Sequence, residues 1–292
     1  MVLRLTAFLL SATIATLGPA LADDDVPPVV GGQTYLQHLL TRAKAGHRGI
    51  TSVVVEGPRD AGKEVVVLGS TRGARYVFTK VANPDLSLGN AITADRRHFV
   101  VRTAFKSNSG HRLGTMVISF AYRAGMSTKP MVTTARAIAD DVARATLSTK
   151  NAVDPYPYSS AYTGRTFAQL LTERTIARHP ELLVMMIHAT PPGATTNVII
   201  GSNIGRIGKA ADEDDLRVID KGETNLEVGG DNDRFETELP LLDAGGTRIG
   251  ALGLVFSYNG GDKQAIHKRG LAIRDEVAKA IASNAVLFQP VR

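Results

Sequence analysis

One stretch of the chain gathers residues that could bind a small molecule. It begins at His188 in an apolar segment and runs through a glycine-rich connection to the acidic run 212–215. A polar residue on an apolar strand needs a partner, either a protein acceptor or a ligand. We therefore expect a pocket lined by His188, Ser202, Asn203, Arg206, Lys209 and Asp215. Arg206 or Lys209 would pair with an anionic group if the ligand carries one.

The same stretch departs from the motifs of nucleotide and metal sites. Residues 201–209 have neither Walker spacing, since Ala210 follows Gly208-Lys209, nor Gly-x-Gly-x-x-Gly. The acidic run lacks the alternating spacing of an EF-hand loop. We expect it instead to begin a short helix, where the helix dipole favours acids. We predict no metal ion and no cofactor, with a metal at the acidic run as the open alternative.

Catalytic signatures and nucleic-acid signatures are also missing from the sequence. There is no His-Glu-x-x-His and no Gly-x-Ser-x-Gly, so we predict no catalytic residue, and an enzyme of unknown class stays a third possibility. The formal charge is +6, but the basic residues are scattered and there is no tryptophan. Binding to nucleic acid favours clustered basic residues with stacking aromatics, so we predict no nucleic-acid partner.

The first 22 residues are typical of a secretory signal peptide. Arg4 precedes an apolar stretch, and Ala20-Leu21-Ala22 forms an A-x-A cleavage site. The apolar run is too short for a membrane anchor, which needs about 20 residues, and we expect no membrane span after cleavage. The chain has no cysteine, which excludes disulfides and a lipid anchor on cysteine. We expect a periplasmic location.

An internal repeat organises the rest of the chain. A shift of 132 residues aligns 67–70 (Val-Leu-Gly-Ser) with 199–202 (Ile-Ile-Gly-Ser), and His47 with His179. The shift becomes 136 at Phe120 and Phe256, and 135 in the last helices. Such long matches with small changes in spacing indicate a duplication.

Both copies predict the same elements. Each opens with a capping box, Thr34-x-x-Gln37 or Thr166-x-x-Gln169, before an apolar helical stretch that ends near a histidine. Two apolar strands follow, at 51–56 and 65–68 or at 183–188 and 197–200. After a variable connection, a strand with period-2 alternation leads through a turn into a longer strand, and an amphipathic helix closes the copy. Strands in sequence with helices at the ends indicate an α+β antiparallel module.

This order resembles the PAS-like Cache domains, extracytoplasmic sensor modules with a five-stranded antiparallel sheet. The resemblance is carried by three stretches, 199–209 (IIGSNIGRIGK), 214–216 (DDL) and 239–256 (LPLLDAGGTRIGALGLVF). It implies two tandem PAS/Cache-like modules, each with about five strands flanked by N- and C-terminal helices. It also implies a pocket between the sheet face and the connection after the second strand.

We therefore expect a signal peptide at 1–22, a first module at 31–150, a linker at 151–163 and a second module at 164–288. The favoured function is a periplasmic small-molecule-binding or sensory protein whose pocket lies in the second module. It would hand its state to a membrane-bound signalling partner. The main alternative is a protein–protein adaptor that binds no small molecule.

Overall fold

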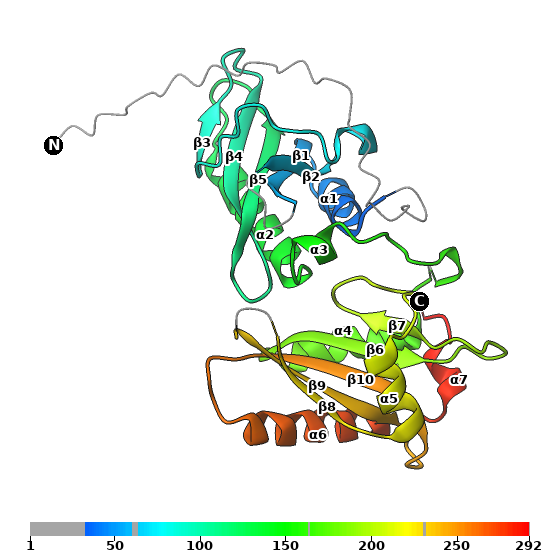
Figure 1. The fold of residues 1–292 in the computed structure, drawn as a ribbon. Helices are drawn as coiled ribbons and strands as arrows, with labels where there is room; N and C mark the ends of the chain where they lie inside the picture. Colours follow the sequence, from blue (N-terminus) through cyan, green and yellow to red (C-terminus); the bar gives the residue numbers. More distant parts are fainter. Residues whose placement is uncertain (1–32, 60–63, 163, 230–231, 292) are drawn as a thin grey trace. The chain divides into compact units, whose positions relative to one another are not determined.

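The computed structural model describes residues 33–59, 64–162, 164–229 and 232–291. The expected signal peptide lies outside the described residues. The chain divides between Asp154 and Pro155 into two compact units, hereafter the first and second modules (Figure 1). No helix among the described residues combines the length and the apolarity that crossing a membrane requires.

The first module is a five-stranded antiparallel sheet with a helix at each end of its sequence. Its sheet order is β2-β1-β5-β4-β3. In chain order the elements are α1 (Tyr35–Gly46), β1 (Ile50–Pro58), β2 (Val65–Ser70), β3 (Gly89–Ile92), β4 (His98–Lys106), β5 (Arg112–Ala121), α2 (Lys129–Arg144) and the short α3 (Thr149–Ala152).

The second module repeats this topology, with the sheet order β7-β6-β10-β9-β8. Its elements are α4 (Phe167–Arg178), β6 (Leu182–Ala189), β7 (Val198–Ser202), α5 (Glu213–Lys221), β8 (Asn225–Gly229), β9 (Arg234–Leu242), β10 (Arg248–Ser257), α6 (Lys263–Lys279) and the short α7 (Asn284–Leu287). The predicted fold class, two tandem PAS-like α+β modules, is confirmed. One element differs: between Tyr76 and β3, a stretch that the structure describes in full, the first module has no helix, whereas the second module has α5 in the corresponding connection before β8.

In each module one face of the sheet forms the hydrophobic core with the helices at the two ends of the module. Alternate residues of a strand point to the same face, and the predicted alternation is confirmed in both long hairpins. The core face of the first module is formed by Phe99, Val101, Phe105, Met116, Ile118 and Phe120, packed with α1 and α2. The core face of the second is formed by Leu239, Leu241, Leu252, Leu254 and Phe256, packed with α4 and α6.

Each predicted capping box forms only one of its two expected hydrogen bonds. Thr34 and Thr166 do accept the backbone N–H of Gln37 and Gln169, at 3.1 and 3.3 Å. The glutamine side chains do not return to the cap. Each instead reaches the last residue of the adjoining strand, Ser70 or Ser202, where its amide donates to the carbonyl and accepts from the N–H. Those strand-end backbone groups are buried and need partners.

The outer edge of each sheet is covered by the segment that follows its second strand. In the first module, Val67 N donates to Thr79 O at 3.0 Å, and Phe78 N donates back to Val67 O at 2.7 Å. In the second, Ile199 N donates to Lys209 O at 2.9 Å, and Gly208 N donates to Ile199 O at 2.8 Å. The connection therefore folds back along β2 or β7 before it crosses to the other face of the sheet.

Candidate functional site

The face of the second sheet that points away from α4 and α6 carries ionisable residues on two of its strands. Strand pairing places His188 of β6 beside Ala251 of β10, and Glu238 of β9 beside Gly253 of β10. Residues two apart along a strand share a face, so Glu236 also lies on this side. Ala251 and Gly253 lie on β10, the strand between His188 and the two glutamates. Because Gly253 has no side chain, Glu236 and Met186 approach its backbone: a Cβ there would lie 3.6 Å from Glu236 Oε1 and 3.4 Å from Met186 Cε.

Helix α5 covers this face by packing on β9 and β10 (Figure 1). The helix begins with a complete capping box, in which Asp212 Oδ1 accepts the Asp215 N–H at 3.3 Å and Asp215 Oδ2 accepts the Asp212 N–H at 2.8 Å. Val218 is buried and anchors the helix to the sheet. The predicted acid-rich first turn of a short helix is thus confirmed, and it positions Asp215 over His188.

Three side chains converge under the first turn of α5. His188 Nδ1 lies 3.6 Å from Asp215 Oδ2. Glu238 joins them, and one ligand atom from each of the three lies within 4.8 Å of the other two. The side chain of His188 is 2% exposed and that of Asp215 is 14% exposed. Glu238 is 4% exposed. We refer to His188, Asp215 and Glu238 as the triad.

The imidazole of His188 is buried without hydrogen bonds. Among the residues that the structure describes, neither Nδ1 nor Nε2 has a hydrogen-bond partner. Burial lowers the pKa of His188 below its usual value, although the carboxylates of Asp215 and Asp212 act to raise it. The ring is therefore neutral at neutral pH, and one of its nitrogens offers a lone pair.

The carboxyl groups at the site divide into protonated and ionised members. Burial, a hydrogen bond with Asp215 and the charge of Asp215 raise the pKa of Glu238 to about 9. Burial also acts to raise the pKa of Asp215, but the hydrogen bond with Glu238 and the neighbouring His188 outweigh it and leave that pKa below its usual range. The pair therefore shares one proton at neutral pH.

Glu236 lies next to this pair on β9. Burial, with repulsion from Glu227 and Asp215, raises the pKa of Glu236 to about 7, against the opposing charge of Arg206. The site thus holds more carboxyl groups than the neighbouring cations can balance, and its acids respond by retaining protons.

Two of the predicted cations do lie near the triad. Arg206 and Lys209 are half-buried in the connection before α5, and their charges act to lower the pKa of His188. Lys209 Nζ lies 3.9 Å from Asp212 Oδ2. Arg206 has a φ of +61°, which is the left-handed region that disfavours residues other than glycine. The structure thus brings four of the six predicted residues together: His188, Arg206, Lys209 and Asp215.

The side chains of Ser202 and Asn203 form hydrogen bonds with the backbone at the end of β7. Ser202 Oγ accepts the N–H of Ile204 at 3.2 Å. Asn203 Oδ1 accepts the N–H of Met185 at 2.9 Å, and its Nδ2 donates to the carbonyl of Leu183 at 3.0 Å. These bonds continue the pairing of β7 with β6 beyond Ser202, the last residue of β7. A contact of either residue with a ligand stays a prediction.

Sequence reasoning missed Glu236 and Glu238. In the sequence they alternate with Phe235, Thr237 and Leu239, which is typical of a strand with a solvated outer face. Their face is covered by α5, which makes them part of the site. A signal was available, because the partner strand β10 carries the small residues Ala251 and Gly253 on that face, which lets the side chains of neighbouring strands approach one another.

The first module presents a balanced ion pair at the equivalent place. Strand pairing puts Glu56 at the position of His188 and Arg102 at that of Glu238. Arg102 Nε lies 3.5 Å from Asp85 Oδ2, and its Nη1 donates to the Asp85 carbonyl at 3.1 Å. Burial raises the pKa of Glu56, while the charge of Arg102 counteracts it.

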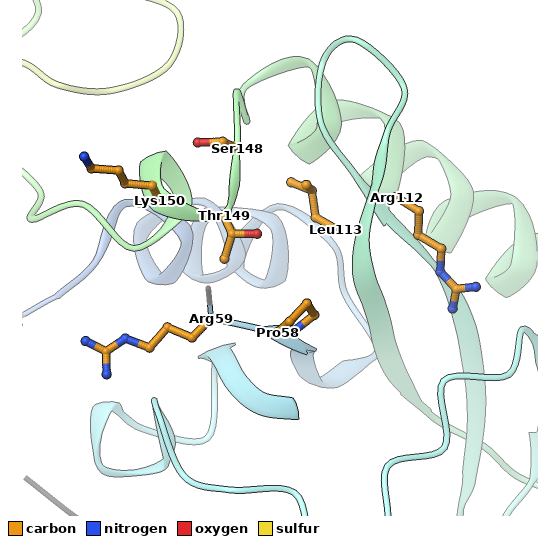
Figure 2. A pocket seen from close by; sticks show the side chains of 7 residues that line it. All are labelled: Pro58, Arg59, Arg112, Leu113, Ser148, Thr149 and Lys150. Atoms are coloured by element: carbon orange, nitrogen blue, oxygen red, sulfur yellow. The ribbon is translucent and has the colours of Figure 1, made fainter. Parts of the chain in front are cut away.

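The first module also contains an open pocket of about 400 Å³ near the end of β1 and the start of β5. It is lined by Pro58, Arg59, Arg112, Leu113, Ser148, Thr149 and Lys150 (Figure 2). Its charged ends diverge: the Arg59 guanidinium lies 4.7 Å from the ring centre of Phe78, and Arg112 donates to the Leu86 carbonyl and Thr115. This pocket does not gather polar groups towards a common point.

Comparison with known proteins adds little to this geometry. No family model matches the chain, and no curated protein matches it. The solved structures similar to it include a putative GAF sensor protein from Burkholderia vietnamiensis, at 17% identity over 41% of this chain and 76% of that chain, with a TM-score of 0.30. Another is the repressor BlcR of Agobacterium tumefaciens, at 11% identity over 47% of this chain and 75% of that one, with a TM-score of 0.26.

A third similar structure is the DhaR(N)–DhaL complex of E. coli. Its identity is 10% over 77% of this chain and 86% of that chain, with a TM-score of 0.25. Scores this low carry no argument about function.

Proposed function

We propose that this chain is an exported ligand-binding protein with a sensory role, and that its second module binds a small ligand under α5. The observation that carries the proposal is His188, a buried imidazole whose two nitrogens lack hydrogen-bond partners while two carboxyl groups converge on it. Buried polar groups are nearly always satisfied, so such a group calls for a functional explanation. A ligand that supplies the missing contacts is that explanation.

The arrangement of the second module suits a ligand-controlled change. Helix α5 holds the ligand-facing Asp215 in its first turn, and the helix rests on the sheet through few buried side chains, chiefly Val218. A ligand that bridges Asp215 to His188 would fix α5 on the sheet, because it adds contacts that only the closed arrangement offers. The chain could then pass that state to a membrane-bound signalling partner.

Export to the periplasm is part of the proposal. It is supported by the signal-peptide pattern of residues 1–22 and by the lack of cysteine. The Cache-type assignment is supported by the hairpin stretch 239–256 and by the ionisable residues His188, Glu236 and Glu238 on the sheet face under α5. The first module serves in this proposal as a structural or partner-facing duplicate, since Arg102 occupies its equivalent site.

A thermal-shift screen tests the proposed function. The protein from Asp23 onward would be screened against organic acids, amino acids, purines and divalent metals, because a ligand that binds only the native state raises the unfolding midpoint. We expect a saturable shift that is lost in His188→Gln and kept in the matched first-module variant Glu56→Gln. A folded protein that gives a flat screen would refute the proposal and favour the adaptor alternative.

A further inference from the structure

We propose that the ligand class of the second module is a divalent transition-metal ion, bound by His188, Asp215 and Glu238. This inference rests on the proposed function and names the ligand of the same site. The sequence indicated no metal because its motifs are local, whereas these three residues come from β6, α5 and β9 and meet only in the folded module.

The donor atoms suit such an ion. A neutral imidazole nitrogen with two carboxylate oxygens is a donor set that first-row transition metals accept. The proton that Asp215 and Glu238 share would be released to solvent as the ion binds. Bonds from zinc to nitrogen and oxygen are about 2.0–2.2 Å long, which places two ligand atoms of a tetrahedral site about 3.4 Å apart. His188 Nδ1 and Asp215 Oδ2 lie 3.6 Å apart. Since no pair of the three exceeds 4.8 Å, small side-chain rotations would complete the site.

Two features show that the cluster is more than a group of surface acids. His188 and Glu238 are 2% and 4% exposed. In the described part of the chain, the nitrogens of His188 and the Oε1 of Glu238 lack hydrogen-bond partners. Asp215 is already oriented, since its Oδ2 accepts the Asp212 N–H at 2.8 Å. Backbone hydrogen bonds that hold a ligating carboxylate are a common second shell of metal sites.

The charges around the triad leave it able to attract a cation. Lys209 lies next to Asp212, at 3.9 Å, and the charge of Arg206 acts on Glu236. Both cations also act on His188, and Lys209 acts on Asp215, but four acids (Asp212, Asp215, Glu236 and Glu238) gather around these two cations. Three protein ligands would leave further coordination positions on the ion for water or for a second ligand, as in open zinc sites.

The first module supplies an internal negative control. Arg102 places a guanidinium at the position of Glu238, and Glu56 replaces the imidazole. A guanidinium has no lone pair to offer and repels a cation. The inference therefore predicts one ion per chain, in the second module.

The test is equilibrium dialysis of untagged protein from Asp23 onward, freed of metal with a chelator, against Zn²⁺, Mn²⁺ and Ca²⁺ in turn. We expect one Zn²⁺ per chain, with Mn²⁺ weaker, in keeping with the usual order of affinities. Ca²⁺ should be weakest because it prefers all-oxygen ligands. Glu238→Gln and His188→Gln should each raise the Kd for Zn²⁺ roughly 100-fold, at or above the upper end for losing a second-shell contact.

Matched controls keep the result interpretable. Glu56→Gln in the first module and Asp214→Asn, an exposed acid one residue from Asp215, should leave the Kd for Zn²⁺ unchanged. Circular dichroism of each metal-free variant checks that it folds. Less than one ion per chain, or an unchanged Kd in folded Glu238→Gln, would overturn the inference.

The outcome separates this inference from the proposed function. If no metal binds but an organic compound still gives a saturable thermal shift that His188→Gln abolishes, the ligand pocket stands and the metal assignment fails. If neither metals nor organic compounds bind the folded protein, both fail.

Discussion

The two modules share one sheet topology and differ on one face of the sheet. On the core face the pairs Phe99 and Phe235, or Ile118 and Leu254, are alike in burial and character. On the other face, an acid and a paired arginine in the first module stand where a neutral histidine and a protonated acid stand in the second. A duplicated fold is therefore maintained by one face of its sheet, which leaves the other free to acquire or lose a site.

The largest expected effect is on Zn²⁺ binding, when Glu238 is replaced by its first-module counterpart. Glu238→Arg introduces the first-module residue into the triad. Its guanidinium would occupy the position of the ion and repel other cations. We expect no measurable Zn²⁺ binding by equilibrium dialysis, a loss on the order of 100-fold or more. The paired change Glu56→His in the first module should create no second site, because Arg102 remains; a second bound ion would break the comparison.

The second largest expected effect is on the pH dependence of stability, to which the second module should contribute more than the first. In the metal-free protein the pKa of Glu236 is about 7 in the folded state against 4.5 for the free side chain. A raised folded pKa stabilises the protein below about pH 4.5, and this stabilisation is lost as the pH rises through 7. Glu236 alone should lower the free energy of unfolding by about 3 kcal/mol over that window, and Glu238 adds to the fall because its folded pKa is also raised. Chemical unfolding between pH 4.5 and 8 measures it.

Two glutamine variants sharpen this contrast. Glu236→Gln should remove the part of the pH slope that Glu236 contributes and leave the part that arises from the raised pKa of Glu238. Glu56→Gln in the first module should remove less than Glu236→Gln, because Arg102 counteracts the effect of burial there. Equal slopes in the wild type and in Glu236→Gln would contradict the unbalanced acidity assigned to the second module.

Removing the first-module arginine should destabilise the protein to a smaller extent. Arg102→Ala deletes the contacts of the guanidinium with Asp85 and leaves Glu56 without its neighbouring cation. We expect a loss of about 1.5 kcal/mol in the free energy of unfolding, the lower range for a charge-assisted hydrogen bond because both partners are partly exposed. Arg136→Ala, an exposed change on α2, is the control and should stay within about 0.5 kcal/mol.

The smallest expected effect is an increase in the free energy of unfolding. His188→Leu removes a buried imidazole without hydrogen bonds, so the free energy of unfolding of the ligand-free protein should rise by about 1 kcal/mol. Thermal unfolding in the presence of a chelator measures it. A lower midpoint than the wild type would mean that His188 serves the structure, and would weaken its assignment to a binding site.

Sequence reasoning reached most of the fold because the strands and helices carry clear periodicity. The strand around Val101 buries Phe99, Val101 and Phe105, and the helix around Val277 buries Ile273 and Val277, as their apolar spacing predicts. The short edge strands β3 and β8 were not separated from the variable connection, since four or five residues with little burial give no pattern.

The site was only half predictable for a related reason. His188 was visible because it interrupts an apolar strand, and Asp215 because it lies in the acid-rich start of a helix. The burial of Glu238 depends on where α5 crosses the sheet, which is a tertiary event that local pattern does not encode. The glutamine of each capping box misled in the same way, because its partner lies 33 residues further on.

The segment that folds back along β2 or β7, together with Gln37 or Gln169, bears on how a duplicated chain assembles correctly. Exposed strand edges recruit other strands, and repeated domains are prone to exchange them during folding. Here the backbone groups at one edge of each sheet are engaged by the same module's own connection and glutamine amide. Each module thus covers the edge at β2 or β7 with its own chain. A strand of the other module, which has the same topology, is therefore prevented from pairing at that edge during folding.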